Sequence, residues 1–147
     1  MTAMMKATVF VAPGRIELVD KPIPAIGPND ALIRITTTTI CGTDVHILKG
    51  EYPVVPGLTI GHEPVGVIEK LGSAVQGYRE GQRVIAGAIC PNFNSYAAQD
   101  GAASQDGSYL IPSGHCGGHG YKATAGWRCG NLIDGTQAEY VLVPDAQ

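Results

Sequence analysis

Residues 31–39, Ala-Leu-Ile-Arg-Ile-Thr-Thr-Thr-Thr, constrain the fold more than any other stretch of this sequence. β-Branched residues dominate the run, and they favour the extended backbone of a strand. Further runs with strand character lie at residues 6–11, 15–20, 62–71, 83–89 and 138–143, with turns that contain Gly or Pro between them. Several short strands joined by such turns predict a mainly β protein, either a barrel or a sandwich.

Two stretches depart from this strand pattern. Residues 43–48 predict a short helix, in which the Thr43 hydroxyl could cap the following amides. Residues 91–130 show no periodic pattern, and such a long stretch is usually functional, held by a ligand or disordered. No G-x-G-x-x-G follows a strand, so the sequence lacks a dinucleotide-binding fingerprint.

Composition narrows the class of protein. The chain has 147 residues, which fits one domain, and its net charge is -3 without a basic stripe, which argues against nucleic-acid binding. It has neither an apolar run long enough to cross a membrane nor a signal-peptide pattern, so we expect a cytoplasmic protein with no membrane partner. The four cysteines are therefore expected to be unlinked, catalytic or metal-bound.

Cys41 and His62 are the natural candidates for a metal site. Cys41 follows the run at residues 31–39, His62 begins the run at residues 62–71, and each lies beside a glycine. Zinc prefers thiolate and imidazole ligands, and a catalytic zinc keeps one open position beside three protein ligands. Either residue alone would more often be a buried structural residue, so the prediction of zinc rests on the pair.

Two carboxylates lie next to these candidates. On a regular strand the side chain of Glu63 would point away from that of His62, but an irregular strand start would let it reach the same ion or its surroundings. Glu63 could otherwise be a surface carboxylate. Asp44 could orient the His62 ring, or it could face the positive end of the short helix.

Two motifs resemble a known family. The pattern Gly61-His62-Glu63-x-x-Gly66, with Gly72 and Val75 after it, is similar to the zinc signature of the zinc-containing alcohol dehydrogenases. Cys41-Gly42-Thr43-Asp44-x-His46 resembles the other active-site segment of this branch of the medium-chain dehydrogenase/reductase superfamily. The resemblance covers essentially the whole chain. It implies a GroES-like, partly open β-barrel with short helices and a long irregular lobe, here residues 1–147, as the N-terminal catalytic domain of a longer enzyme with a Rossmann domain.

The resemblance also implies roles for individual residues. Cys41 and His62 would bind the catalytic zinc, and Glu63 would be the nearby carboxylate that can exchange onto it. Thr43 would take the proton of the zinc-bound alcohol, and His46 would pass it towards solvent through the cofactor ribose. Zinc would act as a Lewis acid, and NAD or NADP would accept the hydride. Thr43 and His46 would make this chain's contacts with the cofactor.

The lobe at residues 91–130 departs from most of the family, which carries a structural zinc there on four closely spaced cysteines. Here that set is absent, and Cys90, Cys116, His119 and Cys129 have irregular spacings. They could in principle form a replacement site, but we expect a lobe without zinc.

The absent cysteines, together with Ala88, Ile89 and Trp127, resemble the bacterial secondary-alcohol dehydrogenases, in which the matching residues line the substrate pocket. Trp127 could instead be an anchor of the lobe. The family's third zinc ligand, a Cys or Asp, lies shortly beyond the equivalent of Gln147. We therefore expect the 147-residue chain alone to be inactive and to bind zinc weakly or not at all. The resemblance to the bacterial members of the family also implies that the whole enzyme is a homotetramer.

Two other functions remain as alternatives at this stage. One is a zinc-free reductase similar to the quinone oxidoreductases, which lack the ligand pair that Cys41 and His62 would form. The other is a non-catalytic GroES-like barrel module, which would need neither the ligands nor a relay through Thr43 and His46.

Overall fold

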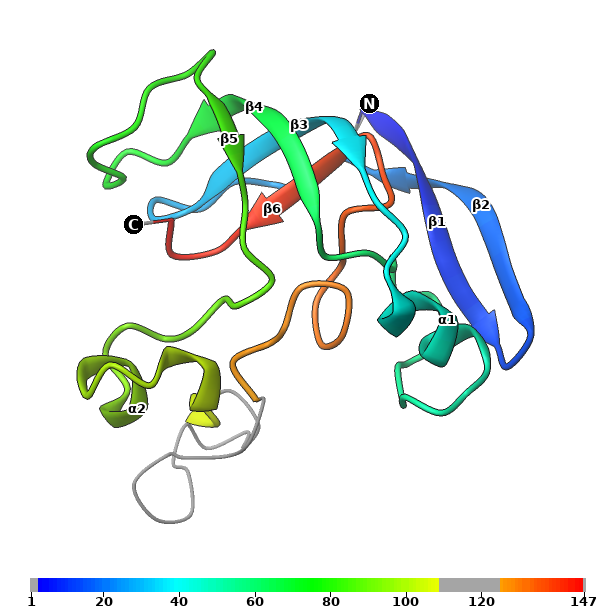
Figure 1. The fold of residues 1–147 in the computed structure, drawn as a ribbon. Coiled ribbons are helices and arrows are strands. Elements are labelled where there is room, and N and C mark those ends of the chain that lie inside the picture. Colours follow the sequence, from blue (N-terminus) through cyan, green and yellow to red (C-terminus); the bar gives the residue numbers. More distant parts are fainter. Residues whose placement is uncertain (1–2, 109–124, 147) are drawn as a thin grey trace. The chain divides into compact units, whose positions relative to one another are not determined.

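Antiparallel strands make up most of the regular structure in the computed structural model, which describes residues 3–108 and 125–146 (Figure 1). The chain divides into two compact units. Unit 1 comprises Met1–Ala88 and Cys129–Gln147, and unit 2 comprises Ile89–Arg128. The strands of the described part of the chain all belong to unit 1, so the prediction of a mainly β protein is confirmed.

The N-terminal part of unit 1 is a β-hairpin. β1 (Met4–Ala12) and β2 (Arg15–Pro22) pair antiparallel, where the sequence predicts two strands. Along β1, the side chains of Met5, Ala7 and Val9 are buried, as expected for alternate residues that share one face of a strand. The hairpin therefore contributes one face to the core of unit 1.

A four-stranded antiparallel sheet forms the second layer of strands. Its order is β5 (Arg83–Ile85), β4 (Pro64–Leu71), β3 (Ala31–Thr38) and β6 (Tyr140–Val143). β3, on which the prediction of the fold depends, lies between β4 and β6 and pairs with both (Figure 1). The β-branched run is therefore an inner strand of the sheet.

β5 is shorter than the sequence predicts: it ends at Ile85, whereas the predicted strand runs to residue 89. Ile85 pairs with Val65, and the residue before Val65 is Pro64, at which β4 begins. Proline has no amide hydrogen to donate, so the ladder loses a donor beyond this pair. The predicted strand ends for lack of a partner, although its own residues favour strand.

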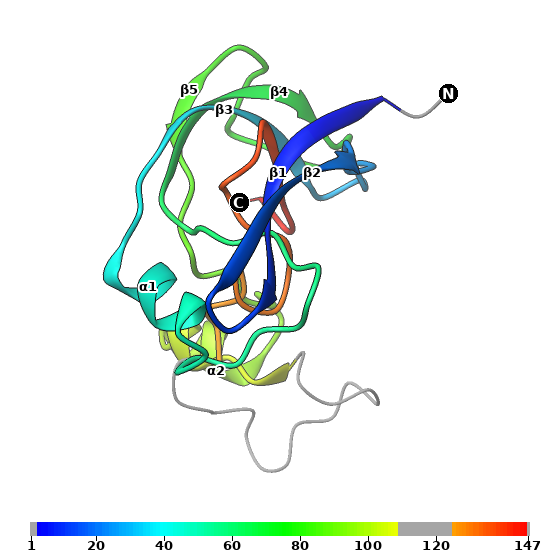
Figure 2. The ribbon, with the colours of Figure 1, turned by 90° about the vertical axis from the view of Figure 1, so that its right-hand side faces the viewer.

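Residues 58–60 connect the hairpin to the sheet. Isolated bridges join Val9 to Thr59 and Ala7 to Ala138, so β1 runs beside both the segment before β4 and the segment before β6. The hairpin and the four-stranded sheet remain separate sheets that do not close into a complete barrel (Figure 2). The predicted partly open β-barrel is confirmed.

The core of unit 1 draws on each of these elements. Ile47 of helix α1 (Gly42–Leu48), Ile60 of the connecting segment and Val141 of β6 are 0%, 2% and 2% exposed. Helix α1 agrees with the helix predicted at residues 43–48.

Among the described residues, no helix has the length and the apolar composition that crossing a membrane would need.

Unit 2 contains two short helices where the sequence shows no periodic pattern. These are α2 (Tyr96–Gln99) and the 3₁₀ helix η1 (Ala103–Gln105). Each is about one turn long, which is too short to produce a recurrent apolar pattern. Ile89 and Trp127, near the two ends of the unit, form an isolated bridge with each other.

The buried carboxylate of Asp106 organises the described part of unit 2. Its Oδ2 accepts a hydrogen bond from the Asn92 amide at 2.6 Å, and its Oδ1 accepts one from the Ser108 amide at 2.9 Å. Burial raises the pKa of Asp106, but these two amides and the hydroxyls of Ser108 and Ser95 lower it by more. The pKa therefore lies below its ordinary value of 3.8.

Asp106→Asn should lower the free energy of unfolding by about 1–3 kcal/mol, because an amide nitrogen would face one of the two donating backbone amides. Since the pKa of Asp106 is lowered in the folded state, its contribution is present above the unfolded pKa and is lost as the pH falls through the folded pKa. Hydrogen exchange of the Asn92 amide, followed as a function of pH, measures both effects. Asp100→Asn, at an exposed carboxylate of the same unit, is the control. Equal protection in the two variants would contradict this account.

Candidate metal centre

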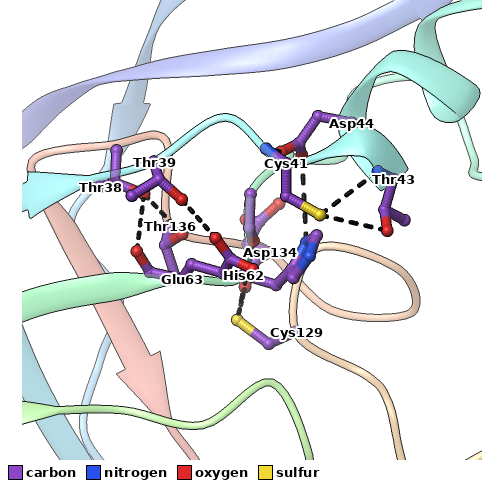
Figure 3. A network of polar contacts seen from close by, with 11 residues as sticks. Thr38, Thr39, Cys41, Thr43, Asp44, His62, Glu63, Cys129, Asp134 and Thr136 are labelled. Carbon is purple, nitrogen blue, oxygen red and sulfur yellow. Dashed lines mark hydrogen bonds and ion pairs between the residues drawn. The ribbon is translucent and has the colours of Figure 1, made fainter.

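Three potential metal ligands converge in unit 1. The ligand atoms of Cys41, His62 and Glu63 all lie within 4.8 Å of one another (Figure 3). Cys41 lies between β3 and α1, whereas His62 and Glu63 lie directly before β4. Because β3 and β4 pair antiparallel, the end of one strand meets the start of the other, and residues about twenty positions apart come together.

Cys41 is held in place by the start of helix α1. It is the N-cap, and its Sγ accepts a hydrogen bond from the Thr43 amide at 3.3 Å. In return, Asp44 Oδ2 accepts a hydrogen bond from the Cys41 amide at 2.8 Å, which completes a capping box. The expectation that the Thr43 hydroxyl caps the helix is wrong, because the chain adopts its extended N-cap conformation at Cys41, two residues earlier.

The backbone before His62 is fixed by a close approach at Gly61. Gly61 has a φ of +93°, and its carbonyl accepts a hydrogen bond from the Thr136 amide at 3.0 Å. A Cβ at Gly61 would lie 2.8 Å from the Gln137 amide nitrogen and 2.9 Å from Thr136 Oγ1. A side chain therefore fits neither the backbone conformation nor the space at this position.

Lys21 and Asp134 stabilise the backbone at Thr59, a few residues before His62, and the sequence interpretation missed both. Lys21 Nζ lies 2.6 Å from each carboxylate oxygen of Asp134, and Asp134 Oδ1 also accepts a hydrogen bond from the Thr59 amide at 2.8 Å. The cluster joins β2, the residues before β4 and the loop before β6. No local motif marks these residues, because they are far apart in the sequence.

Asp44 connects the helix cap to His62. Its side chain is 4% exposed, and its Oδ1 lies 4.0 Å from His62 Nδ1. This Oδ1 has no hydrogen-bond partner among the described residues. A histidine that binds a metal through one ring nitrogen commonly directs the other at a carboxylate, so we expect a metal to be bound by His62 Nε2. The buried carboxylate and the sulfur, nitrogen and oxygen ligands fit a zinc ion.

Glu63 precedes the regular part of β4, so the alternation of a strand does not direct its side chain away from that of His62. Its carboxylate accepts a hydrogen bond from the Thr39 hydroxyl, and its backbone carbonyl accepts one from the Thr38 hydroxyl at 3.4 Å (Figure 3). The irregular strand start considered from the sequence is therefore present. Neither threonine was identified from the sequence, where both appeared only as strand formers.

Thr43 and His46 both lie on α1. Thr43 Oγ1 is 3.3 Å from Cys41 Sγ, so its hydroxyl borders the ligand cluster. His46 is more exposed, and its Nδ1 is hydrogen-bonded to the Glu51 carboxylate. The hydrogen bond from His46 lowers the pKa of Glu51 against a smaller opposing effect of desolvation, and the charges of Lys49 and His46 lower it further.

The remaining predicted site residues are not part of this cluster. Ala88 belongs to unit 1, where its carbonyl accepts a hydrogen bond from the Cys129 amide at 3.4 Å. Ile89 and Trp127 belong to unit 2 and pair with each other there. A role of these three residues in a substrate pocket stays a prediction.

A second zinc site in the lobe, in place of the family's structural zinc site, stays a matter of prediction. Cys116 and His119 lie outside the described residues. Cys90 and Cys129 are buried and are not joined in a disulfide, and each belongs to a different unit. Cys129 Sγ lies 4.0 Å from the Gly61 carbonyl, close to the backbone that carries His62 (Figure 3).

The partly open barrel and its ligand cluster define the class of protein, a GroES-like domain with a zinc-type set of side chains. The sequence matches the alcohol dehydrogenase GroES-like domain over residues 27–147. The chain belongs to this family, as the two motifs indicated.

The relatives agree with this assignment. The chain is 88% identical over 147 residues to an alcohol dehydrogenase of Cupriavidus necator, and the match covers 100% of this chain and 40% of that protein. It is 35% identical to a Mycoplasma pneumoniae protein assigned as an NADP-dependent isopropanol dehydrogenase, over 97% of this chain and 37% of that one. The chain thus spans about 40% of the length of the Cupriavidus relative.

Solved structures show the same fold. A zinc-dependent alcohol dehydrogenase of Streptococcus pneumonia superposes with a TM-score of 0.73 at 38% identity, over 97% of this chain and 36% of that one. A protein of Sinorhizobium meliloti assigned to the zinc-binding dehydrogenases, with NADP bound, gives a TM-score of 0.75 at 34% identity, over 99% and 37%.

Gly61→Ala should destabilise the chain much more than Gly77→Ala. Both glycines have positive φ, +93° and +82°, so alanine is strained by about 1–3 kcal/mol at either position. A Cβ at Gly77 meets nothing within 4 Å, whereas one at Gly61 would overlap backbone and side-chain atoms of residues 136 and 137. Urea unfolding of the two variants measures the difference. Equal losses would show that the close approach at Gly61 contributes nothing beyond the strain of its backbone.

Proposed function

We propose that Cys41, His62 and Glu63 form the catalytic zinc centre of an NAD(P)-linked alcohol dehydrogenase. The observation that carries the proposal is the convergence of a thiol, an imidazole and a carboxylate, with the buried Asp44 beside His62. When bound, zinc supplies Lewis acidity that polarises the oxygen of an alcohol or of the matching carbonyl compound. Zinc-dependent alcohol dehydrogenases among the structural relatives support the same assignment.

The protein's own groups hold the metal and carry the proton. Cys41 would bind zinc through its sulfur, to which the Thr43 amide donates a hydrogen bond. Asp44 orients the His62 ring, so that Nε2 faces the metal. Glu63 would supply a carboxylate oxygen as the third ligand from this chain.

Thr43 and His46 form the path of the proton. Thr43 Oγ1 lies 3.3 Å from Cys41 Sγ, beside the ligand cluster, and would accept the substrate's hydroxyl proton. His46 lies one turn further along α1, and its side chain is 57% exposed. His46 would receive the proton through the cofactor ribose and pass it to solvent, to which its imidazole is exposed.

The substrate class is a secondary alcohol or the corresponding ketone, which agrees with the similarity to the protein assigned as an isopropanol dehydrogenase. NAD or NADP accepts the hydride, and one relative is bound to NADP. The homotetramer and the cytoplasmic location stay predictions from the sequence. The convergent ligand set argues against a zinc-free reductase and against a non-catalytic barrel module.

The first test concerns the metal. It uses a hybrid enzyme, in which this chain replaces the 147 aligned residues of the Cupriavidus alcohol dehydrogenase. His62→Ala and Cys41→Ser should each remove about one zinc per subunit, and with cobalt in place of zinc, Cys41→Ser should weaken the thiolate charge-transfer band. Cys90→Ala, at a buried thiol of unit 2, is the control and should leave both signals unchanged. Full retention of the zinc together with an undiminished band in Cys41→Ser would refute the proposed centre.

The second test concerns the proton path. In the hybrid enzyme, Thr43→Val should lower kcat for alcohol oxidation by roughly 10²–10⁴, because the acceptor of the substrate proton is lost. Thr43→Ser keeps a hydroxyl and should retain most of the activity, while the zinc content should stay unchanged in both variants. Normal turnover by Thr43→Val would remove Thr43 from the mechanism.

The 147-residue chain alone should show no alcohol-dependent formation of NAD(P)H.

A further inference from the structure

The hydroxyl of Thr39 makes the hydrogen bond to the Glu63 side chain. Thr38 is the last residue of β3 and Thr39 follows it directly, and their side chains reach different parts of Glu63. The Thr38 hydroxyl lies 3.4 Å from the Glu63 carbonyl oxygen and 3.1 Å from Thr136 Oγ1, whereas the Thr39 hydroxyl bonds Glu63 Oε2 (Figure 3). Thr38 therefore fixes the backbone of Glu63, and Thr39 fixes its carboxylate.

The carboxylate of Glu63 needs a hydrogen-bond partner that restricts its motion more than the side chains of Cys41 and His62 do. Cys41 is fixed by the capping box of α1, and His62 is 10% exposed and faces Asp44. Glu63 is exposed and precedes β4, so neither burial nor the strand restricts its long side chain. Its freedom to rotate would be lost on binding a metal, unless another contact already restricts it.

The hydrogen bond from Thr39 leaves the carboxylate able to bind a cation. A carboxylate has two oxygens and about four lone pairs, of which one hydroxyl occupies one. Carboxylates that bind metals are themselves commonly hydrogen-bonded, and loss of such a partner typically costs about 10–100-fold in metal affinity. With this bond in place, an oxygen of Glu63 lies within 4.8 Å of the ligand atoms of Cys41 and His62.

We propose that Thr39 is a positioning residue of the metal centre, which holds Glu63 in the orientation in which its carboxylate binds the metal. The proposal rests on the proposed zinc centre and adds to it the residue that controls its carboxylate ligand. Thr39 touches neither the metal nor the substrate, and it acts through the hydroxyl alone. A side chain of the same size without the hydroxyl should therefore fail to replace it.

The test compares Thr39→Val, Thr39→Ser and Thr36→Val in the hybrid enzyme. Thr36 is the matched control, because it lies three residues earlier, on β3, and its hydroxyl also bonds a residue near the start of β4, the carbonyl of Val65 at 3.1 Å. Affinity for Co²⁺ and the rate at which a chelator removes zinc are measured, together with the thermal unfolding midpoint.

Thr39→Val should weaken Co²⁺ binding by roughly 10-fold and accelerate the loss of zinc. Thr39→Ser should restore both values to those of the unsubstituted hybrid, and Thr36→Val should leave both unchanged. Thr39→Val and Thr36→Val should have similar unfolding midpoints. In a Glu63→Ala background, Thr39→Val should have no further effect on metal binding, because its target is gone.

The results separate the two proposals. If the unsubstituted hybrid retains zinc through Cys41 and His62 but Thr39→Val binds Co²⁺ as tightly, the role of Thr39 is wrong and the zinc centre stands. An equal weakening by Thr36→Val, or by Thr39→Val without Glu63, would also overturn the role of Thr39. If the unsubstituted hybrid binds no metal through these residues, the proposed centre itself fails.

Discussion

The close approach of three glycines at the Gly61 carbonyl is the constraint on which unit 1 depends. A Cβ at Gly130 or Gly135 would lie 2.3 or 2.1 Å from this oxygen, which is closer than non-bonded atoms approach. Without side chains there, residues 59–61 can run between β1 and residues 135–137 and bond to both. The same packing joins the hairpin to the remainder of unit 1 and fixes the backbone from which His62 extends.

Asp44 links the start of helix α1 to the proposed metal centre, because each of its two carboxylate oxygens faces one of them. Its Oδ2 completes the capping box of α1, and its buried Oδ1 faces His62 Nδ1. A carboxylate needed only for capping could remain in water, where its charge costs little. Asp44 is buried beside an imidazole, so in the proposed metal centre the orientation of His62 would depend on the helix that also presents Cys41 and Thr43.

Local patterns made much of the fold predictable. The β-branched and aromatic residues of β1 and the β-branched run of β3 indicated strands, because these preferences belong to the residues themselves. The end of β5 at Ile85 was not predictable in this way, since it depends on Pro64 in the neighbouring strand. The helix cap at Cys41 was also missed, because Ser, Thr, Asp and Asn are the usual N-caps and a thiol is not among them.

The sequence by itself determined the family and the kinds of ligand, because Cys41, His62 and Glu63 belong to short motifs whose chemistry depends on residue type. Only the tertiary structure decided what surrounds them. Thr39 reaches Glu63 because β3 pairs with β4, and Lys21 meets Asp134 although 113 positions separate them. Such contacts arise from strand register and packing between distant segments, which local sequence patterns do not encode.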